Sequence, residues 1–249
     1  RVALRVREAV DPNGRLPASP LLADVAASVR DQGFDAAWIL PYAHRPGIAA
    51  GLNAWSAQEV IRYPWLVPGA TVHPGDDDIT GLARTAFEEQ RLRVVKLHCA
   101  VGQFAVSDPA LAPMWELAAA FRVPVLAHAG HASPGETAAG EVLGEVAEVL
   151  RRHPGVSLVL AHAGWPSIAE TLRLMDEFPN LYADLTPIMD RRIEPGVEAL
   201  ERLAGRFLFG SDAPNNPHAA GRLAAEVEAL RLSEPALAAV LGGAAKSLT

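Results

Sequence analysis

Residues 123–130 read Val-Pro-Val-Leu-Ala-His-Ala-Gly, and residues 156–164 read Val-Ser-Leu-Val-Leu-Ala-His-Ala-Gly. Each stretch is an apolar run of the length of a buried strand, and both end in the same pentapeptide, Leu-Ala-His-Ala-Gly. The two pentapeptides lie 34 residues apart, which is the length of one strand plus one crossover helix. The repeat therefore predicts successive parallel strands with His128 and His162 at the same level.

Further runs of β-forming residues give the chain a regular α/β alternation. Each predicted strand is followed by a stretch with helical periodicity, and the seven strands are Ala36–Pro41, Gly69–His73, Val94–Ala100, Val123–Ala129, Val156–Ala163, Leu181–Leu185 and Phe207–Ser211. Strands that alternate with helices pair in parallel through crossover connections. Because the chain has 249 residues and no linker or low-complexity segment, residues 1–249 are predicted to form one domain, an α/β fold of the (β/α)8 TIM-barrel type.

An eight-stranded barrel needs one strand more than the sequence shows. Arg1–Val10 reads as an amphipathic helix or lead-in segment with no strand before it. We therefore expect the first strand to lie upstream of Arg1.

The composition narrows the class of partner. The net charge is −7 and no run of Lys and Arg occurs, which argues against a nucleic-acid partner because such binding depends on clustered cations. The apolar runs are far shorter than the roughly 20 residues of a membrane-spanning helix. Cys99 is the only cysteine, which suits a reducing cytoplasm. We expect a cytoplasmic protein with a small-molecule substrate, and the sequence leaves its oligomeric state open, a homo-oligomer included.

Strand alternation predicts which side chains face the barrel lumen. His128 would share that face with Leu126, and His162 would share it with Leu160 and Leu158. Active sites of such barrels lie at the carboxyl ends of the strands. A lone buried histidine usually does no more than hydrogen-bond at a strand end, but a matched pair on successive strands favours a shared ligand.

The last predicted strand leads into Asp212. Alternation again places this carboxylate in the lumen, where it needs a cation or several hydrogen-bond donors. Two imidazoles and a carboxylate are a suitable set of three protein ligands for a divalent metal, with Zn²⁺ as the default ion, and they leave a position for water. The alternative is that Ser211-Asp212-Ala213-Pro214 only caps the final helices.

Together these residues resemble the amidohydrolase-2 branch of the amidohydrolase superfamily. The resemblance spans nearly the whole chain and rests on the two His-Ala-Gly strand ends, Lys96-Leu-His98, the Phe-Gly-Ser-Asp212 strand and the closing Leu-Gly-Gly-Ala-Ala-Lys-Ser-Leu. Members are TIM-barrel metalloenzymes in which the first strand carries His-X-His, strands 5 and 6 end in histidine, and strand 8 ends in aspartate. The resemblance implies that His128 is a metal ligand, His162 a ligand or an acid/base group, and Asp212 a ligand and general base.

The sequence departs from this family pattern because no His-X-His occurs in it. We expect that motif on a strand upstream of Arg1, in which case the chain without it is expected to be inactive. The alternative is a metal-free barrel with a binding or scaffold role.

Five residues near strand ends are candidate substrate contacts. A lumen-facing Lys96 suits an anionic substrate group, and a carboxylated lysine that bridges two metals, as in some superfamily members, is less favoured. His98 shares this face and either contacts substrate or hydrogen-bonds a loop. His44 and His73 follow strand ends, where each either binds substrate or holds a turn, and Trp165 either walls the pocket or only packs.

The predicted function is that of a metal-dependent hydrolase. A metal-activated water would attack an ester, amide or lactone-type bond of a small molecule, with Asp212 taking a proton and His162 polarising the substrate. The alternative with the same fold and metal is non-oxidative decarboxylation of a small, aromatic acid, and the sequence does not separate the two reactions.

Overall fold

A computed structural model describes residues 21–128, 139–186, 195–216 and 220–249 of the chain. Seven strands form one parallel sheet whose order in space is their order in the sequence. The strands are β1 (Ala37–Ile39), β2 (Leu66–Ala70), β3 (Val94–His98), β4 (Val125–His128), β5 (Leu158–Leu160), β6 (Leu181–Asp184) and β7 (Phe207–Leu208).

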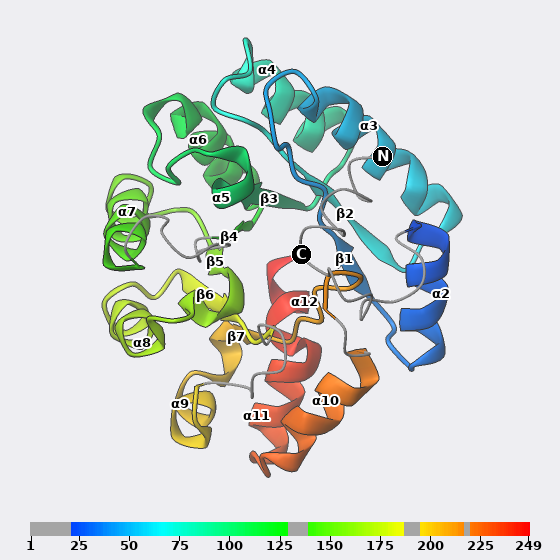
Figure 1. Cartoon of the computed structure of the whole chain (residues 1–249), viewed down its shortest axis with the longest axis vertical. Coiled ribbons are helices and arrows are strands. Elements are labelled where there is room, and N and C mark those ends of the chain that lie inside the picture. The colour runs from blue at the N-terminus through cyan, green and yellow to red at the C-terminus, as the bar shows by residue number, and fades with distance from the viewer. Residues whose placement is uncertain (1–20, 129–138, 187–194, 217–219) are drawn as a thin grey trace.

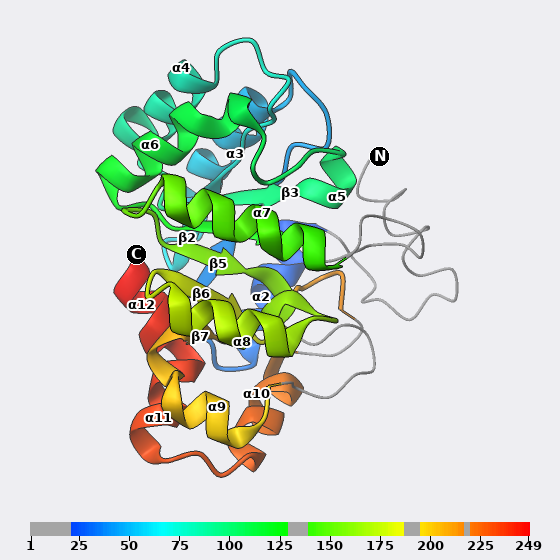
Figure 2. The same cartoon turned by 90° about the vertical axis from the view of Figure 1, so that its left-hand side faces the viewer.

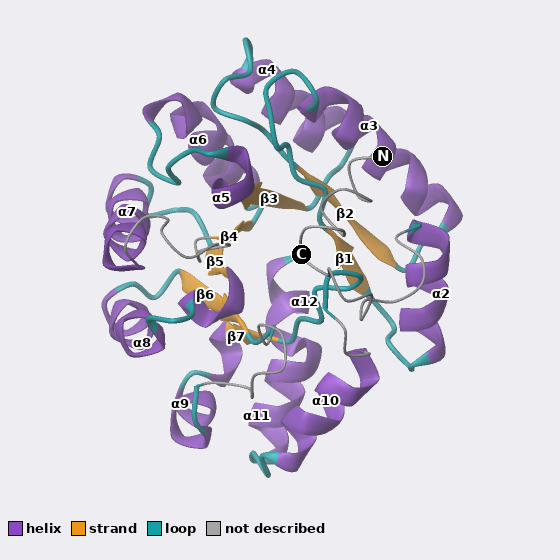
Figure 3. Ribbon diagram, in the orientation of Figure 1, coloured by secondary structure: helices purple, strands orange, loops and turns teal. Residues whose placement is uncertain are grey.

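Helices alternate with the strands and surround them (Figures 1 and 3). Their bounds are α2 (Leu22–Asp31), α3 (Ala49–Arg62), α4 (Ile79–Arg84), α5 (Cys99–Gly102), α6 (Ala112–Phe121), α7 (Ala139–Arg152), α8 (Ile168–Glu177), α9 (Val197–Arg202), α10 (Ala220–Ala229), α11 (Glu234–Ala238) and α12 (Ala244–Leu248). Within the described residues, no helix has both the length and the apolar character needed to cross a membrane.

The seven strands curl into an incomplete barrel with most of the helices outside it, which confirms the predicted TIM-barrel architecture (Figures 1 and 2). In the part of the chain that the structure describes, β1 and β7 are the two edges of the sheet and do not pair with each other. Arg1–Val10, predicted to be a helix or lead-in segment, lies outside the described residues. Because all strands are parallel, their carboxyl ends lie together at one end of the barrel.

A large apolar core fills the space between the sheet and the helices. It contains helix side chains such as Trp115 of α6 and Met175 of α8, both almost fully buried, together with strand residues such as Leu97, Leu158 and Leu160. The strand side chains that face the helices are apolar, and most of those that face the lumen are apolar as well. The strand segments therefore read as nearly continuous apolar runs.

A smaller core lies on the opposite face of the sheet, inside the barrel. Leu126, Val159 and Leu208 from three different strands meet there, and the C-terminal helix α12 adds Ala244 and Leu248. Figure 1 shows α12 within the ring of strands, beside β7. Apolar side chains and α12 fill this part of the lumen. The polar side chains of the barrel interior therefore lie toward the carboxyl ends of the strands.

Several predicted strand boundaries were wrong, and two of these strands show why. The second strand was expected at Gly69–His73 but spans Leu66–Ala70. Pro68 lies within the strand, opposite Ile39 of β1, and its carbonyl still accepts a hydrogen bond from Arg93 N at 2.8 Å.

The strand that leads to His162 was also expected to be longer. It ends at Leu160, and Ala161–Gly164 forms a short 3-10 turn. Leu158 and Leu160 face the outer helices, so the prediction that they share the lumen face with His162 was wrong. The lumen side of β5 carries Val159, and His162 reaches the barrel mouth because the chain leaves the strand before it.

Candidate functional site

A row of three rings lies across the carboxyl ends of β1, β3 and β4. His98 and His128 are register partners at the ends of their strands, and their rings stack with centroids 4.0 Å apart and planes at 14°. Tyr42, in the loop after β1, lies on His98 with a centroid distance of 4.8 Å. The parallel register therefore brings together side chains that lie far apart in the sequence.

His162 joins this row from the turn after β5. Its Nε2 atom lies 3.3 Å from Nδ1 of His128, and the two rings meet edge to face with centroids 4.9 Å apart. The two histidines of the repeated pentapeptide thus face each other directly at the barrel mouth.

The end of β6 holds His162 in place. The carboxylate of Asp184 accepts a hydrogen bond from the backbone N–H of His162 at 3.2 Å, and the carbonyl of Thr186 lies 3.2 Å from Nδ1 of the same ring. Since a carbonyl can only accept, Nδ1 carries the hydrogen, and in the neutral form of the ring Nε2 has a lone pair directed at His128.

Asp212 lies in the loop after β7, and its surface is exposed. Its backbone is left-handed, with φ of 49°, and its carboxylate accepts a hydrogen bond from the side-chain amide of Asn215 at 3.3 Å. The surrounding protein desolvates this carboxyl in part and raises its pKa, whereas electrostatic interactions with His162 and Lys96 act in the opposite direction. Asp212 therefore belongs to the same electrostatic group as the histidines.

Lys96 occupies the lumen face of β3 and is 8% exposed. Burial lowers the pKa of its ammonium, and the carboxylates of Asp212 and Asp184 oppose that shift. The only described lysine on the strands thus has two carboxylates as electrostatic partners at the barrel mouth.

His98 is held in its neutral form. Burial, followed by the nearby charges of Lys96 and His162, lowers the pKa of this imidazole to about 3. Its Nδ1 atom is 3.4 Å from the backbone N–H of Val101 and caps the first turn of α5. This hydrogen bond goes to a helix and not to a loop, so neither of the two alternatives expected for His98 is decided by it.

The remaining predicted substrate contacts, His73, His44 and Trp165, lie beyond the carboxyl ends of β2, β1 and β5. His73 is 9% exposed, and both of its ring nitrogens are engaged, Nε2 with the carbonyl of Gly102 at 3.1 Å and Nδ1 with the N–H of Gly75 at 3.0 Å. His44 is half-buried in the loop after β1, and Trp165 is half-buried directly after the turn that carries His162.

Sequence reasoning missed Tyr42, Asp184 and Thr186. Tyr42 faces the site closely enough for the Asp212 charge, second to burial, to raise the pKa of its phenol. Strand alternation could have found the first two of these residues, because Tyr42 follows Trp38 and Leu40 in steps of two and Asp184 follows Tyr182.

Comparison with known proteins decides the family. The sequence profile of the amidohydrolase family matches residues 11–248, which is almost the whole chain. The chain belongs to the amidohydrolase family. Among curated proteins, none matches this amidohydrolase significantly in sequence.

Several solved structures have the fold of this amidohydrolase. An uncharacterised TIM-barrel protein from Bordetella bronchiseptica is 18% identical with a TM-score of 0.74, over 100% of this chain and 92% of that one. A 5-carboxyvanillate decarboxylase from Novosphingobium aromaticivorans, in complex with manganese and 4-hydroxy-3-methoxy-5-nitrobenzoic acid, is 14% identical with a TM-score of 0.73, over 99% and 86% of the two chains. A dihydroorotase from Campylobacter jejuni is 18% identical with a TM-score of 0.65, over 92% and 79%.

The donor atoms of the site suit a divalent ion in part. Two imidazole nitrogens bound to one tetrahedral ion, with bonds of about 2.0–2.1 Å, lie roughly 3.3 Å apart. The separation of 3.3 Å between His128 Nδ1 and His162 Nε2 agrees with that geometry. Over the described ranges, no group of three or more His, Cys, Asp and Glu side chains is arranged to hold a metal, so the third ligand is not in place.

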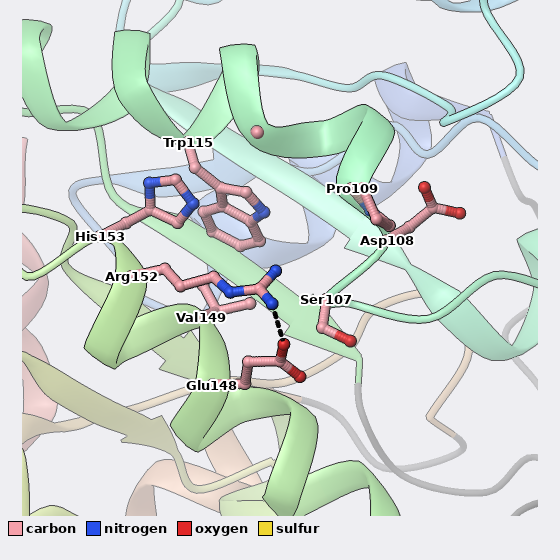
Figure 4. Close-up of a pocket in the computed structure, with 9 residues that line it drawn as sticks. Ser107, Asp108, Pro109, Trp115, Glu148, Val149, Arg152 and His153 are labelled. Atoms are coloured by element: carbon pink, nitrogen blue, oxygen red, sulfur yellow. Dashed lines mark ion pairs between the residues drawn. The ribbon is translucent and has the colours of Figure 1, made fainter.

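A separate pocket lies outside the barrel, between α6 and α7 (Figure 4). It is lined by residues including Trp115, Glu148 and Arg152, and Arg152 forms an ion pair with Glu148 at 2.5 Å. Its volume of about 20 Å³ holds no more than about one water molecule. This pocket is therefore too small for a substrate.

Proposed function

We propose that this amidohydrolase is a metal-dependent hydrolase that cleaves an ester, amide or lactone-type bond of a small molecule with an activated water. The observation that carries the proposal is the approach of His128 and His162 to 3.3 Å at the carboxyl ends of successive strands. This end of the barrel is where enzymes of this architecture have their active sites.

His128, His162 and Asp212 would hold the metal. A bound divalent ion, Zn²⁺ or Mn²⁺, would supply Lewis acidity that lowers the pKa of water toward 7. The hydrogen bond from His162 Nδ1 to Thr186 O leaves Nε2 without a hydrogen. This supports a role for His162 as a ligand over a role as hydrogen-bond donor to the substrate.

The chain's own side chains would perform the remaining steps. The Asp212 carboxylate would accept the proton of the attacking water, because it is exposed to solvent and lies in the electrostatic range of His162. The Lys96 ammonium would bind an anionic group of the substrate. His98 and Tyr42 would form the opposite wall, with His44 and Trp165 as further contacts at the rim.

A metal-dependent decarboxylation of a small aromatic acid is the second candidate. It is favoured by the buried Lys96, which offers a cation to a carboxylate, and by the 5-carboxyvanillate decarboxylase among the structural neighbours. At 14% identity that neighbour supports the fold only, so the reaction must be tested directly.

The test separates the two reactions with one protein. The metal-loaded protein, extended by any residues that the gene encodes before Arg1, is incubated with a panel of esters and lactones while acid release is followed, and with aromatic acids while CO₂ is followed. We expect acid release without CO₂, and a fall of about a hundredfold or more in kcat for Asp212→Asn. His153→Ala, at the residue directly after α7, serves as the control and is expected to keep full activity.

Release of CO₂ from an aromatic acid without ester or lactone cleavage would replace hydrolysis by decarboxylation. Absence of both reactions together with absence of bound metal would leave the metal-free binding barrel as the better account.

A further inference from the structure

The turn that carries His162 has an unfavourable backbone conformation. His162 has φ of 55° and Ala163 has φ of 49°, and Gly164 continues in the same region with φ of 69°. Residues with a Cβ atom rarely adopt left-handed angles, so two such residues in a row need external support.

Asp184 supplies that support. Its Oδ1 atom accepts hydrogen bonds from the backbone N–H groups of His162 at 3.2 Å and Thr186 at 2.8 Å. Asp184 is only 6% exposed, as is Thr186. One buried carboxylate oxygen therefore ties the left-handed turn after β5 to Thr186, two residues beyond the end of β6.

The same link fixes the imidazole. Because Asp184 holds the N–H of Thr186, the carbonyl of Thr186 stands where it accepts from Nδ1 of His162 at 3.2 Å. The ring is then the Nδ1–H tautomer, and its Nε2 lone pair faces His128. Free histidine favours the opposite tautomer, so this preference has to come from the protein.

Close packing leaves the arrangement little room to change. A Cβ atom on Gly164 would lie 2.1 Å from the hydroxyl oxygen of Thr171, and one on Gly210 would lie 2.2 Å from the hydroxyl oxygen of Thr186 and 3.4 Å from Oδ1 of Asp184. The backbone at Gly210, two residues before Asp212, thus packs directly against Asp184 and Thr186, which hold His162.

We propose that Asp184 is a positioning residue, which with the Thr186 carbonyl locks His162 in the Nδ1–H tautomer and directs Nε2 toward the metal site. This inference rests on the proposed function for the use of Nε2, but the tautomer itself does not depend on a metal. Groups that orient a histidine ligand typically change metal affinity by about 10- to 100-fold when they are removed.

The test compares Asp184→Ala with Asp184→Asn, whose amide oxygen can still accept both hydrogen bonds. Tyr182→Phe is the matched control, because Tyr182 lies on the same face of β6 but outside this network. The first readout is the tautomer of His162 in the metal-free, isotope-labelled protein, read from proton–nitrogen correlation spectra and assigned with His162→Asn. The second is the dissociation constant for Mn²⁺ by calorimetry.

We expect the Nδ1–H form in wild type, Asp184→Asn and Tyr182→Phe, and a shift toward the Nε2–H form in Asp184→Ala. Mn²⁺ affinity is expected to fall by about 10- to 100-fold in Asp184→Ala alone. If Asp184→Ala does not fold, the wild-type spectrum decides, since an Nε2–H tautomer there overturns the inference.

Two further results would overturn it: an Asp184→Ala variant with the wild-type tautomer and affinity, or an Asp184→Asn variant that loses both. A wild-type protein that binds no Mn²⁺ but shows the Nδ1–H tautomer would contradict the proposed function and support the positioning role. A failure of the positioning role of Asp184 can therefore be distinguished from a failure of the proposed function.

Discussion

Gly164 is the residue that allows the chain to turn between His162 and α8. Its φ of 69° suits glycine, and a Cβ atom there would lie 2.1 Å from Thr171 Oγ1. Gly164→Ala is therefore expected to lower the free energy of unfolding by about 1–3 kcal/mol, measured by urea denaturation.

Gly144 is the control for that change. It is exposed in α7, and a Cβ atom there would meet no atom within 4 Å. Gly144→Ala is expected to raise the free energy of unfolding by about 0.5–1 kcal/mol. If both variants gained stability, the constraint on the left-handed turn would not exist.

Cys99 begins α5, directly after His98, and its thiol is expected to react slowly. Burial and the Glu145 carboxylate raise the pKa of this thiol to about 12, so almost none of it is the reactive thiolate at mildly alkaline pH. We expect iodoacetamide to modify the folded protein at least about tenfold more slowly than the protein unfolded in urea. Equal rates, measured by mass spectrometry, would mean that the thiol is not shielded.

Among the single residues of the site, those that belong to a recognisable sequence pattern could be predicted. His128 and His162 stand out because a pentapeptide repeats, and Asp212 because it ends an apolar run. Asp184 and Thr186 have no such pattern. Their role consists of hydrogen bonds to a turn 22 to 24 residues earlier, which become visible only when β5 and β6 are placed side by side.

Among the elements, β5 shows how the core supports the site. Leu158 is fully buried between the sheet and the outer helices, two residues before the strand ends. Leu158→Ala is expected to lower the free energy of unfolding by about 2–5 kcal/mol, because it removes buried methyl groups and leaves a cavity. Thermal or urea unfolding measures this loss.

Ile61 on α3 provides the comparison, because it is 78% exposed. Ile61→Ala is expected to change stability by no more than about 0.5 kcal/mol. Similar losses for the two variants would contradict the assignment of Leu158 to the core.

All seven strands could be predicted because each is a short apolar run between helical stretches. The residues at which the strands begin and end could not be predicted. Pro68 stays within β2 because its carbonyl, which needs no N–H, still pairs with Arg93, and β5 stops before His162 because Asp184 and Thr186 hold the turn outside the sheet. Both boundaries depend on tertiary hydrogen bonds that a local pattern does not contain.

For the whole molecule, the parallel order of the sheet explains why distant residues meet. Each residue of the site ends a strand or follows one in the sequence, and the barrel collects the carboxyl ends of those strands at one mouth. These residues are Tyr42, His98, His128, His162 and Asp212. This arrangement follows from the alternation of strands and helices, so the location of the site was predictable even where the orientation of individual side chains was not.

The central claim is that His128 and His162 bind one divalent metal together. The most direct measurement is metal content by elemental analysis after dialysis against Zn²⁺ or Mn²⁺, on this chain and on a version with any residues that the gene encodes before Arg1. We predict about one equivalent of metal, its loss in His128→Ala and in His162→Ala, and its retention in His153→Ala. If no version holds metal, or if His128→Ala holds as much as wild type, the claim is contradicted.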